Sequence, residues 1–283
     1  MKTLAIAFGL ALLSAAGSAG AADLYQPEPA PQPEPIVQPV AASGWYLRGD
    51  VGYAFGHSRG GYYFPDGNYK EFDHTKLDDS WFGGAGIGYQ VTKHFRVDFT
   101  GDYGSGADFK GHSECGDSSC YSNDTSSAHM LSLLANAYVD LGTYYGITPY
   151  VGAGIGGTHI DFGKFTSSTH CGGSACGGAY DLSFDYDGKS DWRFTYALMA
   201  GASVDLTCNL KFDTSYRYRH VSGGGMSENI VASDAYANPY GRSYDKGIDL
   251  HDVRAGLRYT FGGCAQPAPV YATYEQPSEP VYK

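Results

Sequence analysis

His251–Phe261 reads HDVRAGLRYTF and decides the fold, because alternate residues along it carry incompatible chemistries. One set is apolar: Val253, Ala255, Leu257, Tyr259 and Phe261. The other set is charged or small: Asp252, Arg254, Gly256, Arg258 and Thr260. Successive side chains of a β-strand point to opposite faces, so this stretch predicts a strand with one apolar and one charged face.

The same alternation recurs along the chain, and it predicts eight antiparallel strands. The expected strands are residues 45–55, 80–91, 94–103, 130–141, 148–160, 192–206, 210–220 and 251–261. The connections alternate in length: 90–94, 142–147 and 207–209 are short turns, whereas 56–79, 104–127, 162–190 and 222–249 are long loops. Outer-membrane barrels have short periplasmic turns and longer extracellular loops. We therefore expect an all-β fold, an eight-stranded antiparallel transmembrane β-barrel with four long extracellular loops.

A soluble two-sheet sandwich would also alternate, and three features favour the membrane barrel over it. Charges of both signs share the inner face, which suits a polar lumen better than a packed core. Aromatic residues gather toward the strand ends, as an interfacial girdle requires. Closing the sheet also leaves no unpaired strand edge in lipid.

The chain ends predict export and two flexible arms. Lys2, an apolar core from Leu4 to Leu13 and small residues from Ser18 to Ala22 indicate a signal peptide, cleaved after Ala21 or Ala22. A signal anchor is the alternative, and the short apolar core argues against it. We expect a signal peptide at 1–22, a Pro-rich periplasmic linker at 23–43, the barrel at 44–261 and a Pro/Tyr-rich periplasmic tail at 262–283. The arms are interpreted as spacers, with a docking peptide as the alternative.

Composition and charge narrow the function classes. The chain has 40 Gly, 25 Tyr and 14 Phe, which suits short strands with many interfacial aromatics. A net charge of -11 argues against nucleic acid as a partner and against attachment to anionic lipid by charge alone. The expected surroundings are outer-membrane lipid and lipopolysaccharide.

Several motifs resemble one family. GWYLRGDVGYAF, TPYVGAGIG, DTSYRYRH and HDVRAGLRYTF, behind the signal peptide and Pro-rich lead, are similar to the small outer-membrane β-barrel proteins of alphaproteobacteria. That porin-like family includes haemin-binding and surface-antigen members. The resemblance covers residues 44–261 and implies insertion by the outer-membrane assembly machinery, which reads a terminal aromatic strand. Tyr259 and Phe261 match that assembly signal, and the tail after Phe261 is a departure from most members.

The charged face predicts an ion-pair network in the lumen, because eight strands enclose a space that side chains can fill. The network comprises inward Arg48, Arg96, Arg193, Arg217, Arg219, Arg254 and Arg258 with inward Asp50, Asp98, Asp102, Asp140, Asp205, Asp213 and Asp252. Unpaired charges in such a wall are costly, which favours a structural network. A narrow channel beside the glycine-lined strands is the alternative.

The six cysteines fall into three pairs by position, and an exported chain favours disulfides. Cys115 and Cys120 share the second long loop, and Cys171 and Cys176 share the third. Cys208 precedes the seventh strand and Cys264 follows the eighth, so antiparallel pairing would bring them together. A zinc site made of the four loop cysteines is the alternative.

Histidines mark the loop rim without a defining spacing: His57, His74, His112, His129, His159, His170, His220 and His251. We expect no metal, no cofactor and no enzyme activity, since no nucleophile and base stand out and GAGIG lies in a strand. The predicted function is a structural and surface-presenting outer-membrane barrel that supports membrane integrity and contacts an extracellular or cell-wall partner. The alternatives are a narrow porin, a haem-binding receptor, and an outer-membrane protease or acyltransferase.

Overall fold

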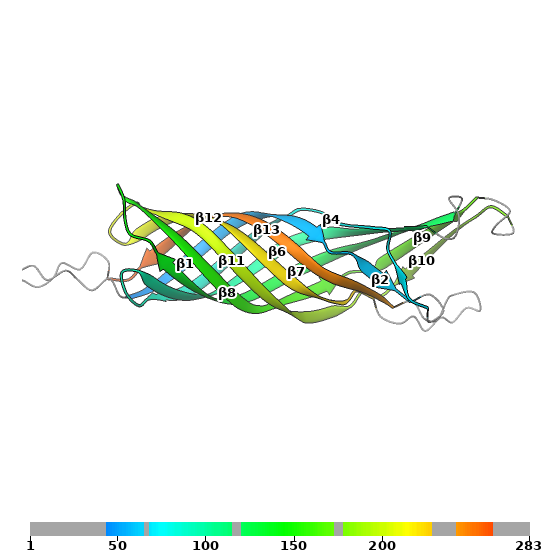
Figure 1. Ribbon diagram of the computed structural model, residues 1–283, viewed down its shortest axis with the longest axis horizontal. Helices are drawn as coiled ribbons and strands as arrows, with labels where there is room; N and C mark the ends of the chain where they lie inside the picture. Colours follow the sequence, from blue (N-terminus) through cyan, green and yellow to red (C-terminus); the bar gives the residue numbers. More distant parts are fainter. Residues whose placement is uncertain (1–43, 65–67, 115–119, 173–177, 228–241, 263–283) are drawn as a thin grey trace, which may run out of the picture. The chain divides into compact units, whose positions relative to one another are not determined.

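The computed structural model describes residues 44–64, 68–114, 120–172, 178–227 and 242–262. Its architecture is a single antiparallel β-sheet that closes on itself (Figure 1). No helix in these ranges is long and apolar enough to cross a membrane.

Eight long strands form the closed ring. They are β1 (Gly44–Ser58), β5 (Ser80–Gln90), β6 (Phe95–Glu114), β7 (Cys120–Asp140), β8 (Ile147–Phe162), β11 (Ser190–Asp205), β12 (Leu210–Gly225) and β13 (Ser243–Thr260). Each strand pairs antiparallel with the next, and β13 pairs back onto β1 through Val51 opposite Ala255. The predicted eight-stranded antiparallel barrel is confirmed.

The alternation that predicted the barrel has its expected physical meaning. On β13, Val253 and Leu257 are about half exposed on the outside, whereas Arg254 and Arg258 are each 2% exposed. The outer face of the ring carries apolar side chains that lipid would cover, and the inner face carries the charges.

One rim of the barrel carries the short turns, as predicted, and the other carries more sheet than predicted. The expected first long loop contains β2 (Gly61–Tyr63), β3 (Lys70–Glu71) and β4 (His74–Leu77). The third contains β9 (Phe165–Cys171) and β10 (Tyr180–Tyr186), and β9 pairs with β7. We call these five strands, with residues 107–114 of β6 and 120–128 of β7, the extension. Figure 1 shows β2, β9 and β10 at the end of the barrel opposite to the short turns.

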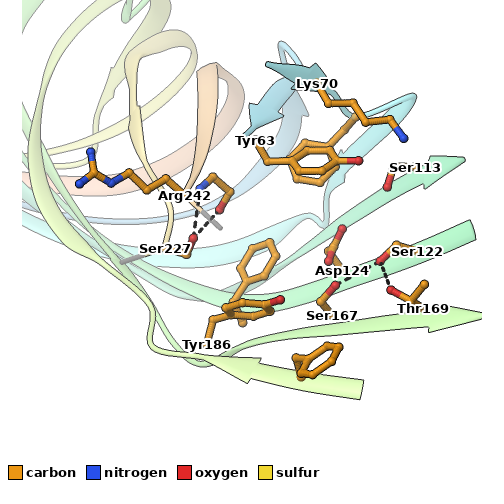
Figure 2. Close-up of a pocket in the computed structure, with 14 residues that line it drawn as sticks. Tyr63, Lys70, Ser113, Ser122, Asp124, Ser167, Thr169, Tyr186, Ser227 and Arg242 are labelled. Atoms are coloured by element: carbon orange, nitrogen blue, oxygen red, sulfur yellow. Dashed lines mark hydrogen bonds between the residues drawn. The ribbon is translucent and has the colours of Figure 1, made fainter. Parts of the chain in front are cut away.

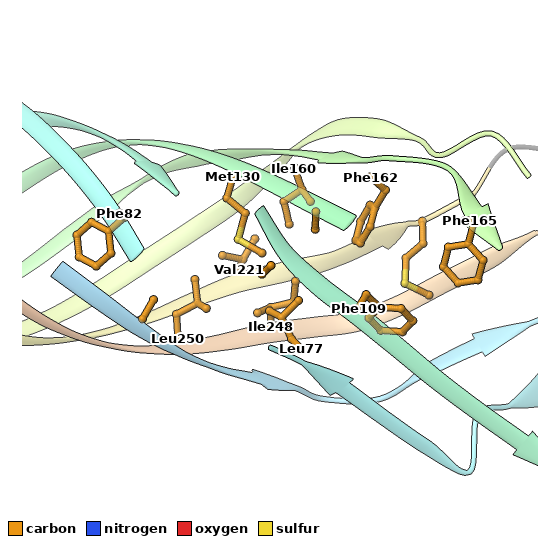
Figure 3. Packing of buried hydrophobic residues seen from close by; sticks show 14 of the residues in the cluster. Leu77, Phe82, Phe109, Met130, Ile160, Phe162, Phe165, Val221, Ile248 and Leu250 are labelled. Carbon is orange, nitrogen blue, oxygen red and sulfur yellow. The ribbon is translucent and has the colours of Figure 1, made fainter. Parts of the chain in front are cut away.

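A hydrophobic cluster fills the lumen between the charged interior and the extension (Figure 3). The part of the cluster next to the charged interior consists of side chains that are all at least nine-tenths buried: Phe82, Met130, Val221, Ile248 and Leu250. Phe109, Phe162 and Phe165 continue the cluster into the extension. The ring centroid of Phe109 lies 6.5 Å from that of Phe162 and 6.0 Å from that of Phe165. The sequence predicted polar groups and glycines on this inner face, so the apolar cluster is a finding of the structure.

The inner glycines make room for large neighbours. A Cβ atom at Gly88 would lie 2.3 Å from the Tyr46 ring, and one at Gly152 would lie 2.5 Å from the Tyr138 ring. Both tyrosines are essentially fully buried. The glycine-lined strands were expected to leave space in the lumen, and that expectation is wrong at these positions because aromatic rings occupy it.

Candidate functional site

The lumen brings most of the predicted charged residues together. Arg48 contacts Asp50 at 2.8 Å and Asp98 at 3.1 Å, and Arg254 contacts Asp50 at 3.0 Å. Asp98 also accepts hydrogen bonds from Asn136 at 2.7 Å and from the Tyr46 hydroxyl at 3.1 Å. Bonds from several strands therefore cross the interior and hold the barrel walls together.

A second group lies next to the hydrophobic cluster. Arg217 bridges Asp102 and Asp252, with 2.7 Å between Arg217 Nε and Asp252 Oδ2. Arg219 contacts Asp252 at 3.3 Å and donates a 2.6 Å hydrogen bond to Ser132. All of these charged side chains are almost completely buried, so each depends on its partners in place of water.

Near the turn rim, Arg96 contacts Asp140 at 3.1 Å and Arg258 contacts Asp213 at 3.1 Å. The Arg96 guanidinium also lies between two aromatic rings, 4.2 Å from the Tyr138 centroid and 4.4 Å from the Tyr150 centroid. Aromatic faces attract cations, so these rings add to the stabilisation of a buried charge.

Two aspartates differ from expectation. Asp205, predicted to point inward, is exposed at the end of β11 and pairs with Lys211 across the turn. Arg193 pairs instead with Asp245, which lay in a predicted loop. Along β13 the inward residues have odd numbers before Gly247 and even numbers after it. Asp245 and Asp252 are therefore both buried. Gly247 has a φ of 117°, which favours glycine.

The extension contains a cavity of about 300 Å³ (Figure 2). One wall carries hydroxyl groups and a carboxylate from β7 and β9: Ser122, Asp124, Ser167 and Thr169. Aromatic side chains complete the lining: Phe165 on β9, Phe184 and Tyr186 on β10, Tyr63 on β2, and Phe72. Ser122 and Ser167 hydroxyls lie 3.1 Å apart, and Thr169 donates to Ser122 at 3.3 Å. This site lies outside the predicted strands, because the fourth strand was expected to begin only at Met130.

Asp124 is the distinctive group of this cavity. It is 6% exposed, and it lies above the apolar outer band, where the outward residues of β7 are Asn123, Thr125 and Ser127. Burial raises the pKa of Asp124 to about 6, against the smaller opposing effects of a hydrogen bond from Ser167 and the charge of His112. Burial and the nearby Asp124 also raise the pKa of Tyr186.

The structure contradicts one of the predicted cysteine pairs. Cys120 carries a free, buried thiol, so the predicted Cys115–Cys120 ring is wrong. Cys120 and Cys171 are direct partners across β7 and β9, and their Sγ atoms lie 2.6 Å apart. Cys171 and Cys208 each take part in a disulfide whose partner lies outside the described residues. Cys115, Cys176 and Cys264 lie outside the described residues, so the Cys171–Cys176 and Cys208–Cys264 pairings stay predictions.

The rim histidines are distributed around the outside and do not converge. His129 stacks on Tyr103, and His159 meets Trp192 edge to face with centroids 5.2 Å apart. The remaining six lie on six other strands: His57, His74, His112, His170, His220 and His251. The His112 ring contacts the ring of Tyr121. Within the described ranges, no three His, Cys, Asp or Glu side chains gather as a metal site would require.

Tyr259 and Phe261, the predicted assembly signal, lie on the outside at the turn rim. Both are about half exposed, and their ring centroids are 5.4 Å apart. The Phe261 amide donates a 2.9 Å bond to Trp45 at the closing seam.

A closed eight-stranded ring with an apolar exterior and a buried ionic interior defines an integral outer-membrane β-barrel protein. The profile of the outer membrane protein beta-barrel domain matches residues 8–261, and the chain belongs to that family. It is therefore a surface-presenting protein of the outer membrane of a Gram-negative bacterium.

Similarity to individual proteins agrees with this assignment. The chain is 36% identical over 280 residues to an uncharacterized protein of Brucella abortus, covering 88% of this chain and 95% of that protein. It is 27% identical over 227 residues to a Rickettsia bellii protein named as a candidate adhesin, covering 76% and 87% of the two chains. The crystal structure of Neisserial surface protein A aligns with this chain at 18% identity and a TM-score of 0.39, covering 77% and 99% of the two chains.

Proposed function

We propose that this protein is a closed, non-enzymatic barrel whose extension makes contact with an extracellular partner. The single observation that carries the proposal is the continuation of the sheet beyond the apolar band. On β7 the outward residues change from Leu131 and Leu133 to Asn123, Thr125 and Ser127. Eight residue steps from Ala128 to Cys120 advance about 27 Å along the strand. The extension is thus a paired, polar-faced sheet, better ordered than a set of free loops.

The filled lumen supports the closed state over the narrow porin. A permeating ion would have to displace the network around Arg217 and then pass the hydrophobic cluster around Phe82, Met130 and Leu250. Breaking a buried ion pair costs roughly 3–5 kcal/mol, so a stable path through this interior is unfavourable. The scattered histidines likewise give no support to a haem receptor.

The outer face of the extension has the chemistry of a contact surface. Tyr121 lies between His112 and His170, with ring centroids 5.7 and 5.2 Å away. His170 in turn contacts Asp181 on β10. Aromatic side chains with polar tips are enriched in protein interfaces, and here they form a row across β6, β7, β9 and β10. Lipopolysaccharide and lipid would surround the apolar outer face of the eight-stranded ring. The assembly machinery would act on the last strand and its aromatic residues up to Phe261.

The test replaces residues 165–186, which include β9 and β10, by a short Gly-Ser turn in bacteria that express the protein. We expect the variant to reach the outer membrane and to remain heat-modifiable on gels, while adherence to epithelial cells falls to the level of cells lacking the protein. Triple substitution of His112, Tyr121 and His170 by Ser should reduce adherence with the sheet intact. Equal adherence of the wild type, the 165–186 replacement and the triple variant would refute the proposal.

Closure is tested separately in planar bilayers. We expect the wild-type protein to show no discrete conductance steps. A variant with Phe82, Met130 and Leu250 replaced by Ala should conduct more readily if the cluster closes the lumen. Regular conductance by the wild type would support the porin instead.

A further inference from the structure

Asp124 breaks the charge balance of the barrel interior. Each of the other buried aspartates among the described residues contacts an arginine: Asp50, Asp98, Asp102, Asp140, Asp213, Asp245 and Asp252. Asp124 is equally buried and forms no ion pair with any residue that the structure describes. A buried, ionised carboxylate without a cation is costly, so the fold retains a group that destabilises it.

The carboxylate lies on the wall of the cavity in the extension, and Figure 2 shows it beside Ser122 and Ser167 and across from Tyr63. Gly111 on β6 and Ser167 on β9 flank Asp124 in the sheet, and neither carries a charge. A Cβ atom at Gly111 would lie 3.3 Å from the Phe72 ring and 3.5 Å from Asp124 Cβ. The glycine therefore lets an aromatic ring approach the acid.

We propose that this cavity binds a small primary ammonium ion with an apolar or aromatic body, whose charge pairs with Asp124. The three N–H donors of the ammonium group match the carboxylate and the hydroxyl oxygens of Ser122, Ser167 and Thr169. The apolar body packs against Phe165, Phe184 and Tyr186, and aromatic faces also attract a cation. Pockets that bind small molecules combine a mostly apolar lining with a few convergent polar groups in this way.

The cations at the rim do not already neutralise Asp124. Lys70 donates a 2.5 Å hydrogen bond to the backbone carbonyl of Glu114. Figure 2 shows the ends of the Lys70 and Arg242 side chains directed away from Asp124. Lys110 on β6 contacts Asp78. Of the surrounding charged groups, only His112 lowers the pKa of Asp124.

The same arrangement predicts the pH dependence of binding. Of the titratable or charged side chains around Asp124, Lys70 on β3, Tyr63 on β2, Tyr186 on β10 and Arg242 beside β13 line the cavity, and Lys110 and His112 lie on the neighbouring strand β6. With a pKa of about 6, Asp124 is ionised at neutral pH and neutral in acid. Affinity for a cation should therefore fall as the pH drops through this value.

The experiment titrates the full-length protein in detergent micelles by calorimetry with benzylammonium, which is protonated at about pH 7.5 as other aliphatic amines are. Benzyl alcohol is the neutral control, and choline carries the charge without N–H donors. We expect saturable binding of benzylammonium, with at least tenfold weaker binding of both controls. Absence of saturable benzylammonium binding, or equal binding of benzyl alcohol, would overturn the proposal, and equal binding of choline would overturn the primary-amine assignment.

Two variants locate the site. Asp124→Asn should reduce benzylammonium affinity at least tenfold, whereas Asp185→Asn, which changes an exposed acid on β10, should leave it unchanged. Heat modifiability on gels verifies that both variants are folded. Should Asp124→Asn not fold, the wild type still decides: a fall from about pH 7.5 to about pH 5 should weaken binding about tenfold if the ligand requires the ionised acid. Unchanged affinity in Asp124→Asn or across this pH range would refute the assignment.

Discussion

Replacement of Leu257 by Arg tests the orientation of the barrel in lipid. Leu257 is 48% exposed on the outside of β13. Aromatic contacts on the same face mark the two edges of the apolar band. His251 contacts Tyr216 at one edge, and Tyr259 contacts Phe261 at the other. Ten residue steps of about 3.3 Å on a strand tilted by about 40° span about 25 Å, which is the height of the apolar band. Leu257 therefore lies one step, about 2.5 Å, from the midplane.

An arginine at the midplane costs about 2–4 kcal/mol, which is a roughly 30- to 900-fold change in the unfolding equilibrium. Leu141→Arg is the matched control, because Leu141 is 51% exposed but follows β7 at the turn rim. At the interface the same change costs about 0–1 kcal/mol.

The assay is urea unfolding of the protein refolded into phospholipid vesicles, followed by tryptophan fluorescence. We expect Leu257→Arg to lower the midpoint clearly and Leu141→Arg to shift it little. Equal shifts in the two variants would refute the assignment of the apolar face to lipid, and a larger shift for Leu141→Arg would place the midplane elsewhere.

Three further predictions concern the interior, the cysteines and the extension. Arg217→Met should destabilise the barrel by about 3–5 kcal/mol in the same assay, since Asp102 and Asp252 lose their shared partner, whereas Lys211→Met should cost at most about 1 kcal/mol; similar costs would contradict a buried network. Peptide mapping without reductant should link Cys208 to Cys264, and a link from Cys208 to Cys171 would overturn the strand pairing. Because the native pKa of Asp124 is about 6 and its unfolded value is near 3.8, the native state binds the proton more tightly and stability falls as the pH rises between these values. Asp124→Asn should thus stabilise the extension near pH 7 by up to about 3 kcal/mol and have little effect near pH 4, as measured by protection from proteolysis. Equal protection of the variant and the wild type at neutral pH would show that burying the Asp124 carboxylate does not destabilise the extension.

The sequence analysis predicted the membrane part of the strands because each lipid-facing position must be apolar. Leu131 and Leu133 mark the fourth strand, and its predicted start at Met130 is the point before which such outward residues are absent. The extension was taken for loops because its outward positions, such as Asn123 and Thr125, face water and need no apolar side chain. Asp124 has the same parity as Ser132 and Asn136, so continuing the alternation would have placed it inward.

Other parts of the interior depend on contacts between distant segments. Asp245 is buried only because Gly247 changes the phase of β13, and a single residue at positive φ gives no periodic signal. Asp205 follows the inward parity but lies at the strand end, where water and Lys211 replace the network. The rings of Tyr46 and Tyr138 fill spaces that glycines on neighbouring strands leave open, and that complementarity appears only after pairing.

The sequence by itself determined the period, the number of barrel strands and the face that meets lipid, because these follow from local alternation and from the cost of polar groups in hydrocarbon. The tertiary structure decided how the lumen closes, which carboxylates contact an arginine, and that Asp124 contacts none among the described residues. Those outcomes depend on register and on side chains contributed by strands far apart in the chain. A charge is neutralised by whatever lies within a few ångströms in space, and sequence neighbours do not specify that distance.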